Sequence, residues 1–267
     1  MLLCTFIHEK YSLNNIDNIA RSIDYLFSPR TNNGWASAGV YCFWDTKTYE
    51  ILYVGLAVDL AQRFKQHNGL IEVNPNGCKR KQILDWFNKN EMIGYSILAQ
   101  SSFSQPSCTR FNIRNGLTRK EMDSQYGELV QQGHEAIVRT EGLLIEAHRK
   151  AKGRKPRWNK VSGSKIGAER ATASHYYLLK LFCGEEDDWN ISRKSILTLY
   201  QNATYEKWED YLHAIRLFAI THRYSFNEAL KRYHEISNKI SPVLNSVLEQ
   251  IKSEIIDNNY LPKKWTI

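Results

Sequence analysis

The chain has 267 residues, 42% of them hydrophobic and 24% charged, which is typical of folded globular proteins and excludes extensive disorder. No apolar run approaches the roughly 20 residues that cross a bilayer, the N-terminus lacks a signal-peptide pattern, and five scattered cysteines show no zinc spacing, so we expect a cytoplasmic protein with reduced thiols. The net charge of +8 is uneven: residues 1–164 hold 22 Lys and Arg against 15 Asp and Glu, and residues 165–267 hold 14 against 13, which indicates a polyanion as partner of the first part.

The first half of the chain alternates helical and strand-like patterns. In chain order these patterns predict a helix, a two-stranded hairpin, two further helices and a third strand, at residues 10–28, 39–44 with 50–54, 56–67, 79–89 and 92–98. We therefore expect the α+β class, with a small antiparallel sheet of about three strands flanked by helices.

An insertion is expected around residues 70–133. Within it, residues 100–120 are polar and basic, as in a loop that faces solvent or a ligand. Asn112, Arg114 and Asn115 have side chains suited to reading base edges. A recognition element and a plain surface loop both fit this segment.

A long helix is expected over residues 135–150, and the pattern changes after Ser162-Gly163-Ser164. From there the sequence shows helical periods without strand signals, at 176–182, 207–220, 226–234 and 243–256. We predict a first domain over residues 1–164, including the N-terminal helix and the insertion, and an all-helical second domain over 165–267. The second domain is expected to form a homodimer interface, to cap the first domain or, less in keeping with its near-neutral charge, to bind DNA.

An ordered set of residues carries a chemical signature. It consists of Gly39-Val40-Tyr41 on the first hairpin strand, Tyr53-Val54-Gly55 on the second, Arg63 and His67 on the helix that follows, Thr140 to Glu146 on the long helix, and Pro156-Arg157-Trp158-Asn159. In order and spacing the set resembles the GIY-YIG nuclease superfamily, and its second half is similar to the nuclease module of the bacterial excision-repair incision subunit. Taken singly, the two tyrosines also fit ordinary cross-strand packing. The Arg63–His67 pair, likewise, also fits a solvated helix face.

The resemblance implies a role for each residue of the set. Tyr41 or Tyr53 is implied as the general base, Arg63 as the clamp on the scissile phosphate, and His67 as a hydrogen-bonding or proton-shuttling group. Glu146 is implied as the ligand of one divalent cation, Mg²⁺ with Mn²⁺ as a substitute, and Asn159 as a residue that holds local geometry.

Glu141 is the alternative metal ligand. It lies five residues before Glu146, about 140° away around a helix, so the two carboxylates are not expected to share one metal. Glu146 is preferred because it follows Leu143-Leu144-Ile145 as in the family pattern, which leaves Glu141 a supporting role.

A basic run leaves directly from this helix. Seven cations and no acid occur in twelve positions, a pattern that fits a phosphate track and equally a solvated face: Arg149, Lys150, Lys152, Arg154, Lys155, Arg157 and Lys160. With Arg114 they are the predicted DNA contacts.

The sequence thus predicts a metal-dependent DNA endonuclease of the restriction, defence or mobile-element kind. A repair or structure-specific nuclease is one alternative, and a nucleic-acid-binding protein without activity, on DNA or RNA, is another.

Overall fold

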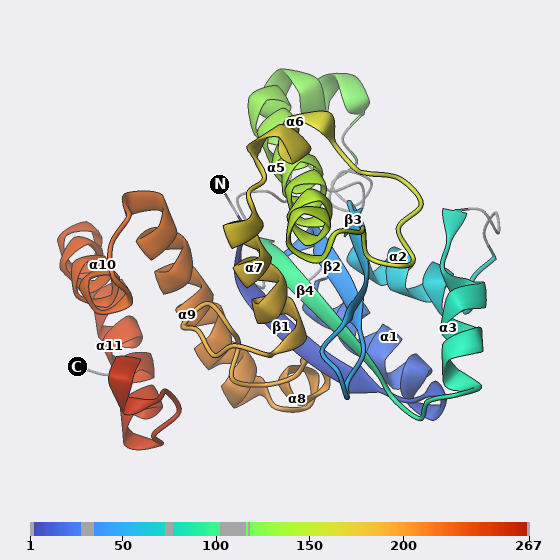
Figure 1. Ribbon diagram of the computed structural model, residues 1–267. Helices are drawn as coiled ribbons and strands as arrows, with labels where there is room; N and C mark the ends of the chain where they lie inside the picture. Colours follow the sequence, from blue (N-terminus) through green and yellow to red (C-terminus); the bar gives the residue numbers. More distant parts are fainter. Residues whose placement is uncertain (1–2, 28–34, 73–76, 102–115, 117, 266–267) are drawn as a thin grey trace.

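A four-stranded antiparallel sheet forms the centre of the protein, in the order β1-β4-β2-β3 (Figure 1). The computed structural model describes residues 3–27, 35–72, 77–101, 116 and 118–265. The strands are β1 (Leu3–Tyr11), β2 (Trp35–Trp44), β3 (Ile51–Ala57) and β4 (Ile93–Ser101). The expected α+β class is confirmed, with four strands in place of about three. The insertion residues Asn112, Arg114 and Asn115 lie outside the described residues.

Strand β1 is the element that the sequence analysis missed. The helix predicted over 10–28 is wrong at its start, because β1 runs to residue 11 and the 3-10 turn η1 (Leu13–Asn15) precedes α1 (Ile16–Leu26). Nearly every residue of β1 is buried, so the strand has no solvent face and no clear alternation. Its one buried acid, Glu9, accepts hydrogen bonds from the backbone N–H groups of Lys10 and Leu197.

The outer side of β1 is also paired. The backbone N–H of Phe6 donates to the carbonyl of Asn190, and the N–H of Ser192 donates to the carbonyl of Phe6. A short parallel bridge, from Phe6 to Ile191, therefore continues the sheet beyond β1. This side of the sheet is not an open edge.

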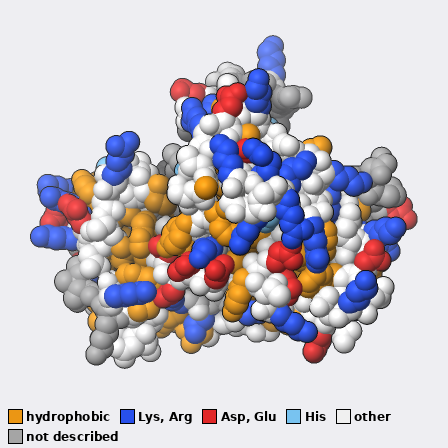
Figure 2. Space-filling model, viewed as in Figure 1, with side chains coloured by type: hydrophobic (Ala, Val, Ile, Leu, Met, Phe, Trp, Pro, Cys, Tyr) orange, Lys and Arg blue, Asp and Glu red, His pale blue; other side chains and the backbone are white. Residues whose placement is uncertain are grey.

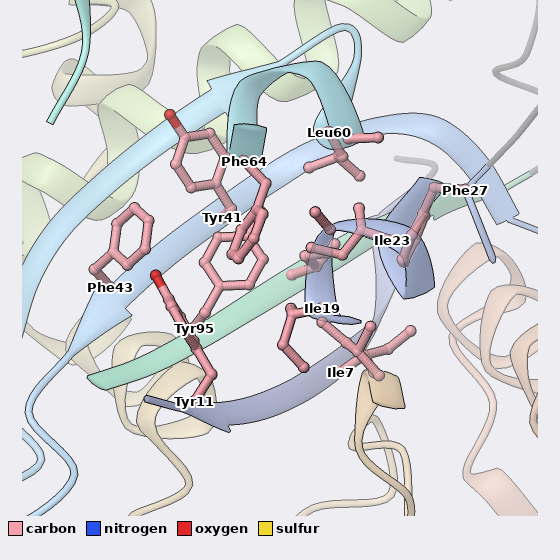
Figure 3. Close-up of a cluster of buried hydrophobic side chains, with 14 of the residues drawn as sticks. Ile7, Tyr11, Ile19, Ile23, Phe27, Tyr41, Phe43, Leu60, Phe64 and Tyr95 are labelled. Atoms are coloured by element: carbon pink, nitrogen blue, oxygen red, sulfur yellow. The ribbon is translucent and has the colours of Figure 1, made fainter. Parts of the chain in front are cut away.

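Two hydrophobic layers enclose the sheet. Helices α1, α2 (Leu60–His67), α3 (Arg80–Phe87) and α8 (Ile196–Gln201) contribute to one layer, whose aromatic centre is shown in Figure 3. Helices α5 (Arg119–Lys152) and α7 (Tyr176–Cys183) contribute to the other. Helix α2 starts at Leu60 instead of residue 56 because Asp59 caps it, accepting from the N–H of Gln62, while residues 56 and 57 complete β3.

The helix expected over 135–150 is the second half of the long helix α5. It begins at a capping box formed by Thr118 and Glu121 and ends at Gly153, whose φ of 74° suits glycine. The short helix α6 (Lys165–Arg170) packs directly on its backbone. A Cβ at Gly142 would lie 2.4 Å from the carbonyl oxygen of Ser164, so glycine permits this close approach.

The remaining helices form a third hydrophobic cluster. They are α9 (Ala203–His222), α10 (Phe226–Ile240) and α11 (Pro242–Asp257), with the 3-10 turn η5 (Lys263–Trp265) after them and the turn η4 (Ala173–His175) before α7. The helices predicted at 176–182, 207–220, 226–234 and 243–256 fall within α7, α9, α10 and α11. Helices α7 and α8 share clusters with the sheet, so the change of cluster falls between α8 and α9; the boundary near residue 164 stays a prediction.

A buried arginine of α9, paired with an acid of the same helix, connects α9 to the segment beside β1. Arg216 and Glu209, both fully buried, lie 2.7 Å apart. The guanidinium of Arg216 also donates to the carbonyls of Trp189 and Ile191. The C-terminal helices are thereby fixed to the sheet. Among the described residues, no helix has the length and apolar character needed to span a membrane.

Candidate active site

The two motif tyrosines meet on the β2–β3 hairpin. Tyr41 pairs with Gly55 and Tyr53 with Phe43, so the tyrosine rings are diagonal neighbours, with centroids 5.9 Å apart. A Cβ on residue 55 would lie 2.6 Å from the Tyr41 hydroxyl oxygen and 2.7 Å from Cε1 of Tyr53. Glycine at this position is therefore what lets the Tyr41 ring lie across the neighbouring strand.

His67 holds Tyr41 from α2. Its Nδ1 accepts a hydrogen bond from the backbone N–H of Lys79 at 2.9 Å, which places the proton of the neutral ring on Nε2. Nε2 lies 2.6 Å from the Tyr41 hydroxyl and donates to it. Burial, reinforced by the positive charges of Arg63 and Lys79, lowers the pKa of His67 to about 3, so the ring is neutral at physiological pH.

Tyr41 in turn lies against Tyr53, with the two ring centroids 5.9 Å apart. Because the Tyr41 oxygen accepts from His67, the hydrogen of its hydroxyl is not used in that bond. Burial raises the pKa of Tyr41 well above its ordinary value. Burial also raises the pKa of Tyr53, while the neighbouring Tyr41 side chain and the charge of Arg63 act in the opposite direction. With these two groups beside it, Tyr53 is the better placed of the two tyrosines to carry negative charge.

Arg63 lies on α2 beside both tyrosines. Its Nη1 donates to Oε1 of Gln66 at 3.0 Å and to the carbonyl oxygen of Gly77 at 3.1 Å, both neutral acceptors. Its positive charge acts on the pKa of Tyr41, Tyr53 and His67. The structure thus brings Tyr41, Tyr53, Arg63 and His67 together.

Glu141, and not Glu146, is the carboxylate beside this group. The charge of Glu141 acts on the pKa of Tyr53, and a Cβ on Gly163 would lie 3.0 Å from its Oε2. Among the described residues Glu141 has neither a hydrogen bond nor an ion pair, and burial raises its pKa to about 7. Glu146 instead accepts two hydrogen bonds from the guanidinium of Arg149, at 2.6 and 2.8 Å, and this contact lowers the pKa of Glu146.

This difference bears on which carboxylate suits a divalent cation. An unpaired, half-buried carboxylate is a ready oxygen ligand, whereas the Glu146 oxygens already accept from the exposed guanidinium of Arg149, which a metal ion would have to displace. Within the described part of the chain, no three His, Cys, Asp or Glu side chains are grouped to hold a metal. A cation beside Tyr53 would depend on the single carboxylate of Glu141 and on water, an arrangement that Mg²⁺ accepts.

Asn159 clamps the edge strand β3. Its Oδ1 accepts from the N–H of Val54 at 3.0 Å, and its Nδ2 donates to the carbonyl of Val54 at 2.8 Å. The N–H of Trp158 donates to the carbonyl of Leu52. These contacts fix the strand that carries Tyr53, in line with the structural role expected for Asn159.

Most cations of the basic run have a partner within the protein and are nevertheless exposed to solvent. Several of its members have partners: Arg149 pairs with Glu146, Arg154 with Glu50, Lys150 donates to the carbonyl of Ala171, Lys155 donates to that of Lys160, Lys152 lies over the Tyr176 ring, and Arg157 lies over the Trp86 ring. Apart from the half-buried Lys155, the cations of the run remain exposed. Figure 2 shows Lys and Arg gathered over α5 and the loop that follows it.

Lys79 is a site residue that sequence reasoning missed. Besides its N–H bond to His67, its ammonium lies 4.8 Å from the centroid of the Tyr53 ring. In the sequence it is one of three consecutive cations at the start of a predicted helix, and that position gives no signal of contact with the tyrosines.

One comparison with known proteins matches this region. Residues 37–105 match the family model described as the GIY-YIG catalytic domain, which covers the hairpin, α2, α3 and β4. No curated protein and no solved structure gave a significant match.

Proposed function

Through residues 37–105 this chain belongs to the GIY-YIG nuclease superfamily, and we propose that it is a metal-dependent endonuclease that hydrolyses DNA phosphodiester bonds. The observation that carries the proposal is the grouping of Tyr41, which His67 holds, with Tyr53, on which the cation of Arg63 and the unpaired carboxylate of Glu141 both act. Hydrolysis of a phosphodiester needs a base for water, relief of charge on the phosphate and a defined geometry.

Tyr53 is the proposed general base. Tyr53 acts in its phenolate form, which the charge of Arg63 and a bound divalent cation would favour and which the Tyr41 hydroxyl would stabilise by donating to the phenolate oxygen. That oxygen takes the proton of the attacking water. His67 fixes the orientation of Tyr41 and stays neutral throughout, because its pKa is about 3. In this scheme His67 positions another residue and does not shuttle the proton.

Arg63 binds the scissile phosphate, and Glu141 holds the cation. The guanidinium of Arg63 donates to the phosphate oxygens, for which it must exchange one of its two neutral acceptors. Mg²⁺, or Mn²⁺ in its place, when bound supplies charge relief on the phosphate and the leaving oxygen. Glu146 is the alternative ligand that the sequence pattern favours.

A matched pair of variants tests this proposal. Plasmid and phage DNA are incubated with the wild type, Glu141→Gln and Glu146→Gln, each in Mg²⁺ and in EDTA. We expect Mg²⁺-dependent cleavage that Glu141→Gln lowers by about two orders of magnitude or more and that Glu146→Gln retains. If Glu146→Gln loses cleavage and Glu141→Gln retains it, Glu146 is the metal ligand. DNA binding without cleavage under every condition would refute the catalytic proposal.

The same experiment separates the biological roles. Discrete fragments from intact duplex DNA support a restriction or defence nuclease, which is the role we propose. Cleavage confined to branched or damaged DNA would instead assign a repair role. Because one site cuts one strand, cleavage of both strands at one place requires two copies or two successive events.

A homodimer through the C-terminal helices is the arrangement we propose for double-strand cleavage. Its support is an exposed apolar stripe where α10 meets α11, in which Ile240 is 75% and Val243 is 77% exposed, with Ile236, Leu244 and Val247 beside them. Sedimentation analysis of the wild type and of an Ile240→Glu, Val243→Glu variant tests it. We expect a dimer that the variant dissociates, and a wild-type monomer at all concentrations would refute it.

A further inference from the structure

Lys79 carries a buried charge that lacks a negative partner. Only 8% of its surface is exposed. Among the described residues its ammonium makes neither an ion pair nor a hydrogen bond, and its recorded contact is the face of the Tyr53 ring. A buried ammonium is unfavourable unless a carboxylate or another anion offsets the lost hydration. A cation–π contact replaces only part of that hydration.

The surroundings of Lys79 increase this excess of positive charge. Burial and the charges of Lys160 and Arg63 all lower the pKa of Lys79, so both of these cations are close enough to repel its ammonium. Arg63 donates to neutral acceptors, and the Lys160 side chain has no partner in the described part of the chain. Such a cluster is stable when an anion joins it.

The excess lies directly at the proposed base. The Lys79 ammonium is over the Tyr53 ring, and the backbone N–H of Lys79 fixes the tautomer of His67, which holds Tyr41. An anion bound by Lys79 and Arg63 would therefore lie beside the Tyr53 side chain. The anion that a nuclease brings to this place is a phosphate of the nucleic acid backbone.

We propose that Lys79, together with Arg63 and Lys160, forms a phosphate-binding site in which Lys79 contacts the DNA phosphate next to Tyr53. The inference rests on the proposed function for the identity of the anion. Lysine suits this role because its compact charge binds phosphate without requiring the planar geometry of arginine. The side chain and the backbone of Lys79 then have separate tasks, since every residue except proline keeps the backbone N–H that donates to His67.

Binding of inorganic phosphate tests the site without requiring cleavage. Phosphate is titrated into the metal-free protein and followed by ³¹P NMR, with the wild type, Lys79→Met, Lys79→Arg and Lys81→Met. Lys81 is the matched control, because it is an exposed lysine two residues away that has no charged partner among the described residues. We expect Lys79→Met to weaken binding about tenfold or more, while Lys79→Arg and Lys81→Met stay close to the wild type.

DNA binding in EDTA gives a second measurement on the same variants. The slope of log K against log salt for a short duplex should fall by about one in Lys79→Met and stay unchanged in Lys81→Met. Thermal unfolding checks that each variant is folded. If the fold of Lys79→Met is lost, the comparison of the wild type with Lys79→Arg and Lys79→Gln decides in the same way.

The outcomes for this site and for the nuclease proposal are distinct. Equal phosphate affinity in the wild type and Lys79→Met, or no phosphate binding by the wild type, overturns the site whether or not DNA is cut. Phosphate binding that depends on Lys79 in a protein that never cuts DNA would support the site and refute the nuclease proposal.

Discussion

Replacing Gly55 with alanine adds one carbon at the point where the two motif tyrosines meet. The added Cβ would lie 2.6 Å from the Tyr41 hydroxyl oxygen, 2.7 Å from its Cζ and 2.7 Å from Cε1 of Tyr53. Ordinary carbon contacts are about 3.5–4.0 Å, so both rings must move by on the order of 1 Å. Tyr41 has little freedom to do so, because it is buried and bonded to His67.

Two magnitudes follow from this displacement. Overpacking of a dense interior costs about 1–3 kcal/mol of the free energy of unfolding. Misplacing a catalytic group by about 1 Å lowers activity on the order of a hundredfold. We therefore expect Gly55→Ala to fold with reduced stability and to lose most of its nuclease activity.

The assay compares Gly55→Ala with Gly77→Ala by urea unfolding and by initial rates of Mg²⁺-dependent plasmid cleavage. Gly77 is the matched control, since its φ is not positive and a Cβ there would meet no described residue within 4 Å. Gly77→Ala should behave as the wild type. Full activity and stability in Gly55→Ala would refute the packing argument at the site.

Three other expectations concern buried polar groups. The pKa of His67, lowered to about 3, favours the neutral ring in the folded state, so stability is complete above pH 6.5 and falls as the pH drops towards 3, with a loss of about 2 kcal/mol at pH 5. Urea unfolding at pH 5 and 7.5 compares the wild type with His67→Gln, which separates this effect from that of Glu141, whose raised pKa acts in the opposite direction. The same pH dependence of stability in both proteins would refute the expectation. Glu209→Ala strands its buried arginine partner and should cost about 3–5 kcal/mol in urea unfolding, a loss below about 1 kcal/mol being contrary to the argument. Asn159→Ala leaves a backbone N–H and carbonyl of β3 unbonded and should cost about 1–3 kcal/mol with faster amide exchange in β3, whereas unchanged exchange would contradict the clamp.

The motif was readable from the sequence because its residues follow one another at fixed spacing on short elements. Tyr41, Tyr53, Arg63 and His67 belong to one hairpin and the helix after it, so local periodicity brings them together. Asn159 came from the same ordered pattern. Strand β1 was not readable, because burial on both faces removes the alternation that marks a strand.

The choice between Glu141 and Glu146 shows where sequence reasoning stops. Helical spacing predicts that the two carboxylates point in different directions, but it does not predict which of them faces the sheet. That depends on how α5 rotates as it packs, and on the contact between Arg149 and Glu146, neither of which is a property of the local pattern. The selection of Glu146 stays a prediction that the paired variants decide. Lys79 illustrates the same limit, because its contacts arise from a loop.

The bridge from Phe6 to Ile191 limits where this chain can be joined to another in a chimera. A chimera joined near residue 164 would separate β1 from residues 190–192, which pair with its outer side, and from the arginine of α9 that holds those residues in place. The exposed backbone would then be free to pair with other chains. A transplant of the first part of this chain that keeps the sheet intact must therefore carry the residues up to at least 192.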